Sequence, residues 1–282
     1  IREMTGILQS GAVRLEQDDD LALIEAALPA NIKLLESFLA ESPDDPQIHV
    51  LLARLYGSYA FAFAERDLEE AELLPGHAPV PVRADSLQDR VRRYYEKGAE
   101  YALKVLEARH PGCTAQLGSV AAAEKCFARI ESQDLPALFW YGFDLGGYVN
   151  HSRGSITALS RAHLAERAMQ RVIEIDPSYY HGGAHLFLMI YAAARPPMAG
   201  GSLKAAMVHY RALQAMHGEN FFPADLFYAR YVLHRQQDRD AFHRVLTNIV
   251  ERPVQPSPHR LLNKMAADRA AVYLAAEDRL FP

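Results

Sequence analysis

Residues 165–177 read Ala-Glu-Arg-Ala-Met-Gln-Arg-Val-Ile-Glu-Ile-Asp-Pro, and they hold the clearest sign of the fold. Apolar residues recur at spacings of three and four, which is the period of an amphipathic helix. The final proline ends the pattern because it lacks the amide proton that a helix interior needs. Residues 99–111 repeat the arrangement 66 positions earlier, with Ala at the first and fourth places, an aliphatic residue at the eighth and Pro at the end. A shared spacing before a shared stop predicts a repeated helical unit.

The helical period continues along almost the whole chain, and very little alternates with period two. Short side-chain oxygens that can cap a helix by accepting a free backbone N–H stand at Asp20, Asp85/Ser86, Ser119, Asp134, Ser155 and Ser202. Prolines and glycines end most segments. Together these signals predict helices at 20–41, 46–65, 87–109, 119–132, 135–150, 155–175, 182–195, 203–216, 223–235, 238–251 and 258–278.

The spacing of the stops indicates the kind of helical fold. Pro43, Pro111 and Pro177 lie 68 and 66 residues apart, about twice the ~34-residue period of a tetratricopeptide helix pair. We therefore predict an all-α right-handed superhelix of about four degenerate tetratricopeptide-like helix pairs with flanking capping helices. The predicted pairs are 46–111, 135–177, 182–217 and 223–253. Residues 1–282 are expected to form a single α-solenoid domain, in which the Pro-rich stretch 74–84 is a connecting loop.

Composition excludes several classes of protein. The chain has 282 residues, 50% of them hydrophobic, and a net charge of −5. This is a globular composition, and it lacks the basic excess that nucleic-acid binding requires. No apolar run reaches the ~18 residues of a membrane span. The sequence contains no P-loop, no G-x-G-x-x-G, no H-E-x-x-H and no G-x-S-x-G motif. We therefore predict no catalytic residues and no cofactor.

Two residue pairs could carry other chemistry. His181 and His185 lie one helical turn apart and could share a metal, but two glycines separate them and no carboxylate follows at ligand spacing. We predict no metal there and interpret the glycines, like Gly200-Gly201, as structural positions before a helix. Cys113 and Cys126 should lie close together because Pro111-Gly112 turns the chain. They would bridge in an oxidising compartment and stay thiols in a reducing one, and the residues leave both open.

Aromatic side chains gather on the first helices of the predicted pairs, which line the concave face of a solenoid. Tyr and Trp combine apolar area with one polar group, which suits a pocket for an amphiphilic ligand. Plain core packing is the alternative for each. The candidate wall residues are Tyr59, Trp140, Tyr141, His185, Tyr191, Tyr228 and Arg230. Arg230 and a protonated His185 could orient a carboxylate, unless Arg230 makes a structural ion pair and His185 caps a helix.

The segment 173–217 also carries an ordered set of motifs. It contains Gly182-Gly183-Ala184-His185, then Pro197, then Gly200-Gly201, then Ala206-x-x-His209-Tyr210-x-x-Leu213. Residues 43–61, 138–141, 228–231 and 262–270 supply further matches, with Phe139 in place of a tyrosine. In all of these the chain resembles the T component associated with TRAP transporters, the TatT family. Asp144, in an otherwise apolar helix, and Asp268, where the family often has Gln, depart from the pattern.

The resemblance spans nearly the whole chain and implies properties that composition did not. It implies an exported periplasmic lipoprotein, with the lipid anchor expected upstream of Ile1 and outside this chain. It also implies an all-helical protein with degenerate tetratricopeptide units. The resemblance further implies that the chain can form ring-like trimers that dock the periplasmic solute-binding P component. A tunnel in each protomer is expected to handle an apolar or amphiphilic ligand, an organic acid, and no catalysis is implied.

The leading hypothesis is therefore a non-enzymatic periplasmic accessory subunit of a TRAP-type transport system. A second hypothesis is a generic tetratricopeptide adaptor that binds a peptide in its concave groove. That groove would need basic or amide residues where this chain has mainly aromatic and small ones. A third hypothesis is an enzyme that uses His181, His185, His209 and His217, but the sequence shows no recognisable acid or metal partner for them.

Overall fold

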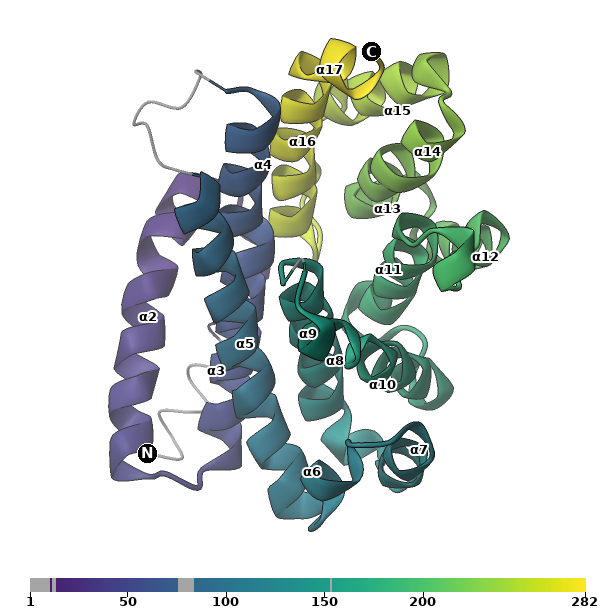
Figure 1. The fold of residues 1–282 in the computed structure, drawn as a ribbon. Helices are drawn as coiled ribbons and strands as arrows, with labels where there is room; N and C mark the ends of the chain where they lie inside the picture. Colours follow the sequence, from purple (N-terminus) through teal and green to yellow (C-terminus); the bar gives the residue numbers. More distant parts are fainter. Residues whose placement is uncertain (1–10, 12–13, 76–83, 153) are drawn as a thin grey trace. The chain divides into compact units, whose positions relative to one another are not determined.

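The computed structural model describes residues 11, 14–75, 84–152 and 154–282. Within these residues every regular element is a helix, which confirms the all-α prediction (Figure 1). The predicted loop 74–84 falls mainly on residues 76–83, which lie outside the described part. Contacts divide the described chain into two compact units. Unit 1 comprises Ala22–Glu65 and Asp85–Tyr179, and unit 2 comprises residues 14–21, 66–75, 84 and Tyr180–Pro282.

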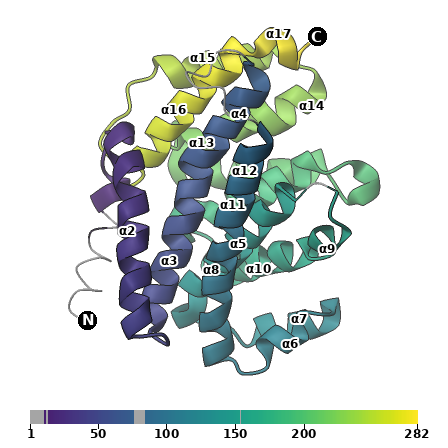
Figure 2. The same cartoon turned by 60° about the vertical axis from the view of Figure 1, so that its left-hand side comes forward.

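Unit 1 is built mainly from long helices that lie beside one another. Figures 1 and 2 both show α2, α3 and α5 side by side. Glu36 of α2 ties them together by accepting hydrogen bonds from Tyr56 of α3 (2.6 Å) and Lys97 of α5 (3.4 Å). The elements are α2 (Leu21–Glu41), α3 (Pro46–Tyr59), the π-helix η1 (Ala60–Ala64), α5 (Ala84–Arg109), α6 (Cys113–Gln116), α7 (Val120–Ala128), the 3₁₀ turn η2 (Ser132–Asp134), α8 (Leu135–Asn150), α9 (Ile156–Leu159) and α10 (Ala162–Ile175).

The helix α8 forms the centre of unit 1 and packs against α3 and α10. Small residues allow the close approach, as the repeat pattern predicted. Ala165 and Ala168 of α10 are fully buried, and a Cβ on Gly142 of α8 would lie only 3.0 Å from the Cβ of Ala168. Larger side chains here would separate the helices, because a close-packed interior has no room for added methyl groups.

Local sequence signals explain where several helices begin. Ser119, Ser155 and Ser202 cap helices by accepting from the amides of Ala122 (3.3 Å), Ala158 (3.2 Å) and Ala205 (3.1 Å). At two other predicted cap positions, Asp134 and Asp85/Ser86, the structure differs from the prediction. The side chain of Asp134 does not cap α8; it is buried and accepts from Arg109 (2.7 Å) and His110 (2.9 Å). Asp85 and Ser86 lie inside the first turn of α5, which begins at Ala84.

The two cysteines form a disulfide in this structure. Their Cα atoms are 5.3 Å apart, and both residues are fully buried. The bond joins α6 to α7 inside unit 1. The prediction that Cys113 and Cys126 lie close together is confirmed. Of the two alternatives, a disulfide or two free thiols, the structure has the disulfide.

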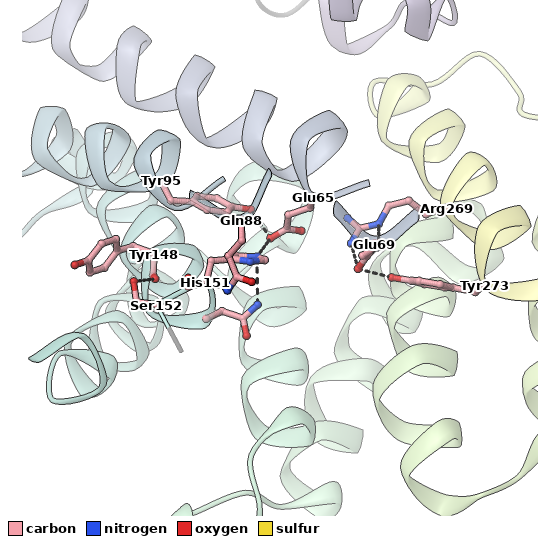
Figure 3. Close-up of polar contacts among 10 residues, drawn as sticks. Glu65, Glu69, Gln88, Tyr95, Tyr148, His151, Ser152, Arg269 and Tyr273 are labelled. Carbon is pink, nitrogen blue, oxygen red and sulfur yellow. Dashed lines mark hydrogen bonds and ion pairs between the residues drawn. The ribbon is translucent and has the colours of Figure 1, made fainter. Parts of the chain in front are cut away.

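A tyrosine, a histidine and a glutamate form a buried polar cluster in unit 1 (Figure 3). Glu65 accepts from the hydroxyl of Tyr95 (2.8 Å) and lies 2.9 Å from Nε2 of His151. The rings of Tyr95 and His151 are stacked with 6.0 Å between their centroids. Gly147 makes room for Tyr95, because a Cβ there would lie 2.6 Å from the tyrosine ring.

Unit 2 contains the C-terminal helices together with α4. Within it, α16 packs against α13 and α15, and the π-helix η5 packs against α15. The elements are α4 (Glu65–Leu73), α11 (Tyr179–Ala194), the 3₁₀ turns η3 (Pro197–Ala199) and η4 (Gly218–Asn220), α12 (Leu203–His217), α13 (Phe222–Phe227), η5 (Tyr228–Leu233), α14 (His234–Gln236), α15 (Arg239–Glu251), α16 (Arg260–Ala275) and α17 (Glu277–Leu280).

The chain enters α11 through a left-handed turn. Tyr180, His181 and Gly182 have φ angles of 48°, 59° and 72°. A Cβ on Gly182 would also come within 3.0 Å of the side chain of Leu213. The predicted structural role of this glycine is therefore confirmed, and the right-handed part of α11 starts after it.

The two helices in each predicted pair touch each other. In the first pair, Lys97 of α5 donates to the hydroxyl of Tyr56 of α3 (3.2 Å). In the second, α8 packs on α10, and in the fourth, α13 and η5 pack on α15. In the third, His185 of α11 meets His209 of α12 (2.9 Å). The arrangement of the pairs as a right-handed superhelix and as one solenoid domain stays a prediction.

Candidate functional site

The seven predicted site residues divide between the two units. Tyr59, Trp140 and Tyr141 belong to unit 1, whereas His185, Tyr191, Tyr228 and Arg230 belong to unit 2. Each group is described within its own unit.

The three residues in unit 1 are packed as core side chains. Tyr59, the last residue of α3, is 7% exposed, and its ring lies 5.6 Å from the rings of Phe63 and Tyr94. Trp140 of α8 is 2% exposed and lies edge-on to Phe139, with centroids 5.0 Å apart.

Tyr141, beside Trp140 in α8, is fully buried, and burial raises the pKa of its hydroxyl to about 12. For all three aromatic residues the role of ligand wall stays a prediction.

A buried carboxyl lies one helical turn beyond Trp140. Asp144 is fully buried, and within the described chain neither of its oxygens has a hydrogen-bond partner. The carboxyl lies against the backbone of Gly57 in α3 and Gly98 in α5, where a Cβ at either glycine would overlap it. Burial raises the pKa of Asp144 well above its ordinary value, because removal from water disfavours the charged form. The sequence signal for this site was the single acid in an otherwise apolar helix.

Arg230 is the charged member of the set in unit 2, and it lies among aromatic rings. Its guanidinium carbon is 5.6 Å from the ring centroids of both Tyr231 and Tyr273. Its Nε atom is buried and has no hydrogen-bond partner among the described residues. Arg230 stands in η5, and π-helical turns are frequent at functional positions because the extra residue redirects side chains. An arginine with donor capacity in an aromatic environment can bind a carboxylate.

The carboxylate of Glu69 already has hydrogen-bond partners of its own. Glu69 of α4 accepts two hydrogen bonds from Arg269 (2.9 and 2.7 Å) and one from Tyr273 (2.8 Å), as Figure 3 shows. Arg269 is 1% exposed, and its guanidinium also lies 5.0 Å from the ring centroid of Phe227. Glu69 therefore neutralises Arg269 and fixes the ring of Tyr273. Sequence reasoning did not identify this cluster, although Arg269 belonged to a quoted motif, because its partner lies 200 residues away.

The helix α12 connects two further predicted residues. His209 contacts His185, with their Nδ1 atoms 2.9 Å apart. The next residue, Tyr210, stacks on Tyr228 with 4.4 Å between centroids, and donates its hydroxyl to Asp225 (2.7 Å). Burial lowers the pKa of His185, so this residue is neutral at pH 7 and acts as a donor or acceptor rather than as a cation.

Tyr191 lies near the C-terminal end of α11. Its ring stacks on Phe187 (5.8 Å between centroids), and the guanidinium of Arg195 lies 4.4 Å from its centroid. Tyr191 and Arg230 stand on different elements, α11 and η5, and are treated as separate candidates.

Two further properties of the described residues concern metal binding and membranes. No group of three or more His, Cys, Asp or Glu side chains there could hold a metal ion. In the same residues, none of the helices combines the length and the apolar character needed to cross a bilayer.

Comparison with known proteins identifies the family. A family model described as TRAP transporter T-component matches residues 17–281. An uncharacterized protein from Treponema pallidum (strain Nichols) is 27% identical over 267 residues, a match that covers 92% of this chain and 80% of the relative. The sequence motifs carry the same resemblance over nearly the whole chain, and the family match over residues 17–281 confirms it. The chain belongs to the TRAP transporter T-component family.

Proposed function

We propose that this chain is the non-enzymatic periplasmic accessory subunit of a TRAP-type uptake system, and that it holds an amphiphilic organic acid in unit 2. Family membership implies that the chain is an accessory component of a TRAP transporter. The proposal adds that the chain binds an organic acid, and that Arg230 binds its carboxylate. It also adds that the chain scaffolds the solute-binding P component.

The observation that carries the ligand proposal is the environment of Arg230. The guanidinium lies against two tyrosine rings, and its buried Nε has no partner among the described residues. Glu69 is occupied by Arg269 and Tyr273. A bound carboxylate would satisfy Arg230 through charge-assisted hydrogen bonds, while the rings would cover an apolar chain.

The test is to titrate a series of straight-chain carboxylic acids into the purified protein by calorimetry. Arg230→Ala should weaken binding by about 10- to 100-fold, because hydrogen bonds to charged groups contribute about 1.5–3 kcal/mol. The matched control is Arg244→Ala, which removes the same charge from an exposed position on α15 and should bind as wild type. Thermal melting checks that each variant is folded.

Two results would contradict the ligand proposal. One is a folded Arg230→Ala variant that binds as tightly as wild type, and the other is a wild-type protein that binds none of the acids. A chain that bound extended peptides instead would favour the adaptor hypothesis. The scaffold role is tested separately, by co-purification with the P component.

A further inference from the structure

Five histidines gather in unit 2 where α11, α12 and the start of α16 meet. His185 and His209 face each other with Nδ1 atoms 2.9 Å apart. One turn earlier in α11, His181 lies near His259, which in turn lies near His217; both centroid distances are 5.3 Å. We call these five residues the histidine seam. The ligand proposal rests on Arg230, and His185 is the one seam residue among the predicted wall residues, so most of the seam has no assigned role.

The contact between His185 and His209 requires that at least one ring be neutral. A hydrogen bond between two Nδ1 atoms needs a proton on one nitrogen and a lone pair on the other. If both rings were protonated, two N–H groups would face each other across the same 2.9 Å. Burial also lowers the pKa of both rings, to about 4 for His209. The pair is therefore intact at pH 7 and breaks when it is doubly protonated.

His217 fastens the left-handed turn that begins α11. Its Nε2 donates to the carbonyl oxygen of His181 (3.1 Å). Tyr180 and His181 both have positive φ, a conformation that is strained for residues with a Cβ and needs support from outside the turn. Gly182 adds to this support by packing closely against Leu213. The C-terminal half of α12 thus holds the turn in place.

His259 adds a third ring to this end of the seam. Its Nε2 donates to the carbonyl oxygen of Asn220 (3.0 Å), and the ring of Phe221 packs against both His259 and His217, with centroids 5.3 and 5.0 Å away. Burial lowers the pKa of His217 and His259, and the charge of His181 lowers both further. Each proton added to the cluster therefore opposes the next.

The acidic groups around the seam are mostly engaged elsewhere. Glu16 approaches one end, with its Oε2 3.7 Å from Nε2 of His181. The other acids on the packed elements have their own partners: Asp19 pairs with Arg260, Glu219 with Arg252, and Asp225 accepts from Tyr210 and Gln214. Protonation of the other four histidines would therefore meet little compensating charge.

We propose that the histidine seam is an acid-sensitive latch, which holds α12 to the left-handed turn when the rings are neutral and releases α12 when they are protonated. The folded pKa values are lowered, so the open state binds more protons below the ordinary histidine pKa of about 6.5. The stabilisation is fully present above that pH and is lost as the pH falls toward about 4. This latch does not depend on the proposed ligand.

Hydrogen exchange measured by mass spectrometry tests the latch. Amides of α12 and of residues 183–190 should lose protection by at least about tenfold between pH 7.5 and pH 5, after correction for the intrinsic exchange rate. The helix α8 in unit 1 should keep its protection. His209→Asn and His217→Gln place a neutral N–H near the original nitrogen and do not titrate. Each should reduce the response to acid. His243→Gln, at an exposed position on α15, should respond as wild type.

Two outcomes would overturn the latch. One is a wild-type α12 whose protection is the same at both pH values. The other is that the folded His209→Asn and His217→Gln variants respond to acid as wild type does. A direct titration of the wild-type imidazoles by NMR covers the case in which a variant does not fold. In that measurement, pKa values at or above about 6.5 for His209 and His217 would contradict the proposal.

Discussion

Asp144 is the residue whose surroundings are hardest to reconcile with a charge. Its carboxyl is fully buried against Gly57 and Gly98, and burial raises its pKa. A raised folded pKa means that the folded protein keeps a proton that the unfolded chain has released. The neutral acid is thus fully tolerated below about pH 4, and unit 1 loses stability as the pH rises above that value.

We expect Asp144→Asn to be more stable than wild type at pH 8 and to differ less from it at pH 4. The difference in unfolding free energy should grow by up to about 1.4 kcal/mol per pH unit between the unfolded and folded pKa values. Trp140 is the single tryptophan of the chain and lies one turn from Asp144, so its fluorescence during urea unfolding measures the change. A pH-independent difference between the two proteins would contradict a neutral Asp144.

The ion pair between Arg269 and Glu69 is the second residue-scale feature with a large expected effect. Arg269 is almost fully buried, and Glu69→Ala would remove the two charge-assisted hydrogen bonds that Glu69 accepts from it. Breaking a buried pair from one side costs about 3–5 kcal/mol. Chemical denaturation followed by circular dichroism measures the loss. Glu174→Ala is the control, since Glu174 pairs with Arg167 and Arg171 at the surface and should cost less than about 1 kcal/mol. Equal losses in the two variants would argue against the cluster.

At the scale of the element, the turn before α12 depends on a glycine. A Cβ on Gly201 would overlap the carbonyl oxygen of Arg195, and backbone cannot move aside as a side chain can. Gly201→Ala should therefore destabilise unit 2 by about 1–3 kcal/mol. Gly118→Ala, at a position with open space around it, should change stability by less than about 1 kcal/mol. Thermal melts of both variants measure the change in stability. An unchanged melting temperature for Gly201→Ala would contradict the structural role of Gly201.

The boundaries of the elements show what the sequence could predict. The predicted helices 135–150 and 203–216 match α8 and α12 within one residue, because proline, serine caps and strong periodicity define them. The predicted helices 46–65 and 223–235 each contain a π-helical turn, η1 and η5, which the sequence did not predict. A π turn changes the backbone without changing the apolar pattern. The left-handed turn before Gly183 was also missed, because Tyr and His rarely adopt positive φ.

At the scale of the whole molecule, the sequence could not predict which of the candidate site residues come together. Periodicity places aromatic residues on helix faces but does not say which of them are buried. Trp140 and Tyr141 are buried in unit 1, and their role as ligand wall stays a prediction. Arg230 was selected for its charge. Its contact with the ring of Tyr273, which donates a hydrogen bond to the distant Glu69, joins residues far apart in the sequence, so no local pattern could have revealed it.

The resemblance to the family also leads to an expectation for the assembled protein. If the chain forms the ring-like trimer expected for this family, native mass spectrometry should show three times the 31.5 kDa protomer mass. Dilution should shift the population toward monomer, because association depends on protomer concentration. A monomer at all tested concentrations would exclude the trimer without affecting the ligand site within one protomer.

The interleaving of the two units has a consequence for synthesis. Unit 2 takes residues 14–21 and 66–75 from the early part of the chain and Tyr180–Pro282 from its end. During synthesis, Glu69 leaves the ribosome well before its partners Arg269 and Tyr273, which lie 200 and 204 residues later in the chain. A prematurely terminated chain would therefore carry an incomplete unit 2 with exposed apolar helices. Such fragments are good substrates for proteases, so the chain order itself favours the survival of full-length copies.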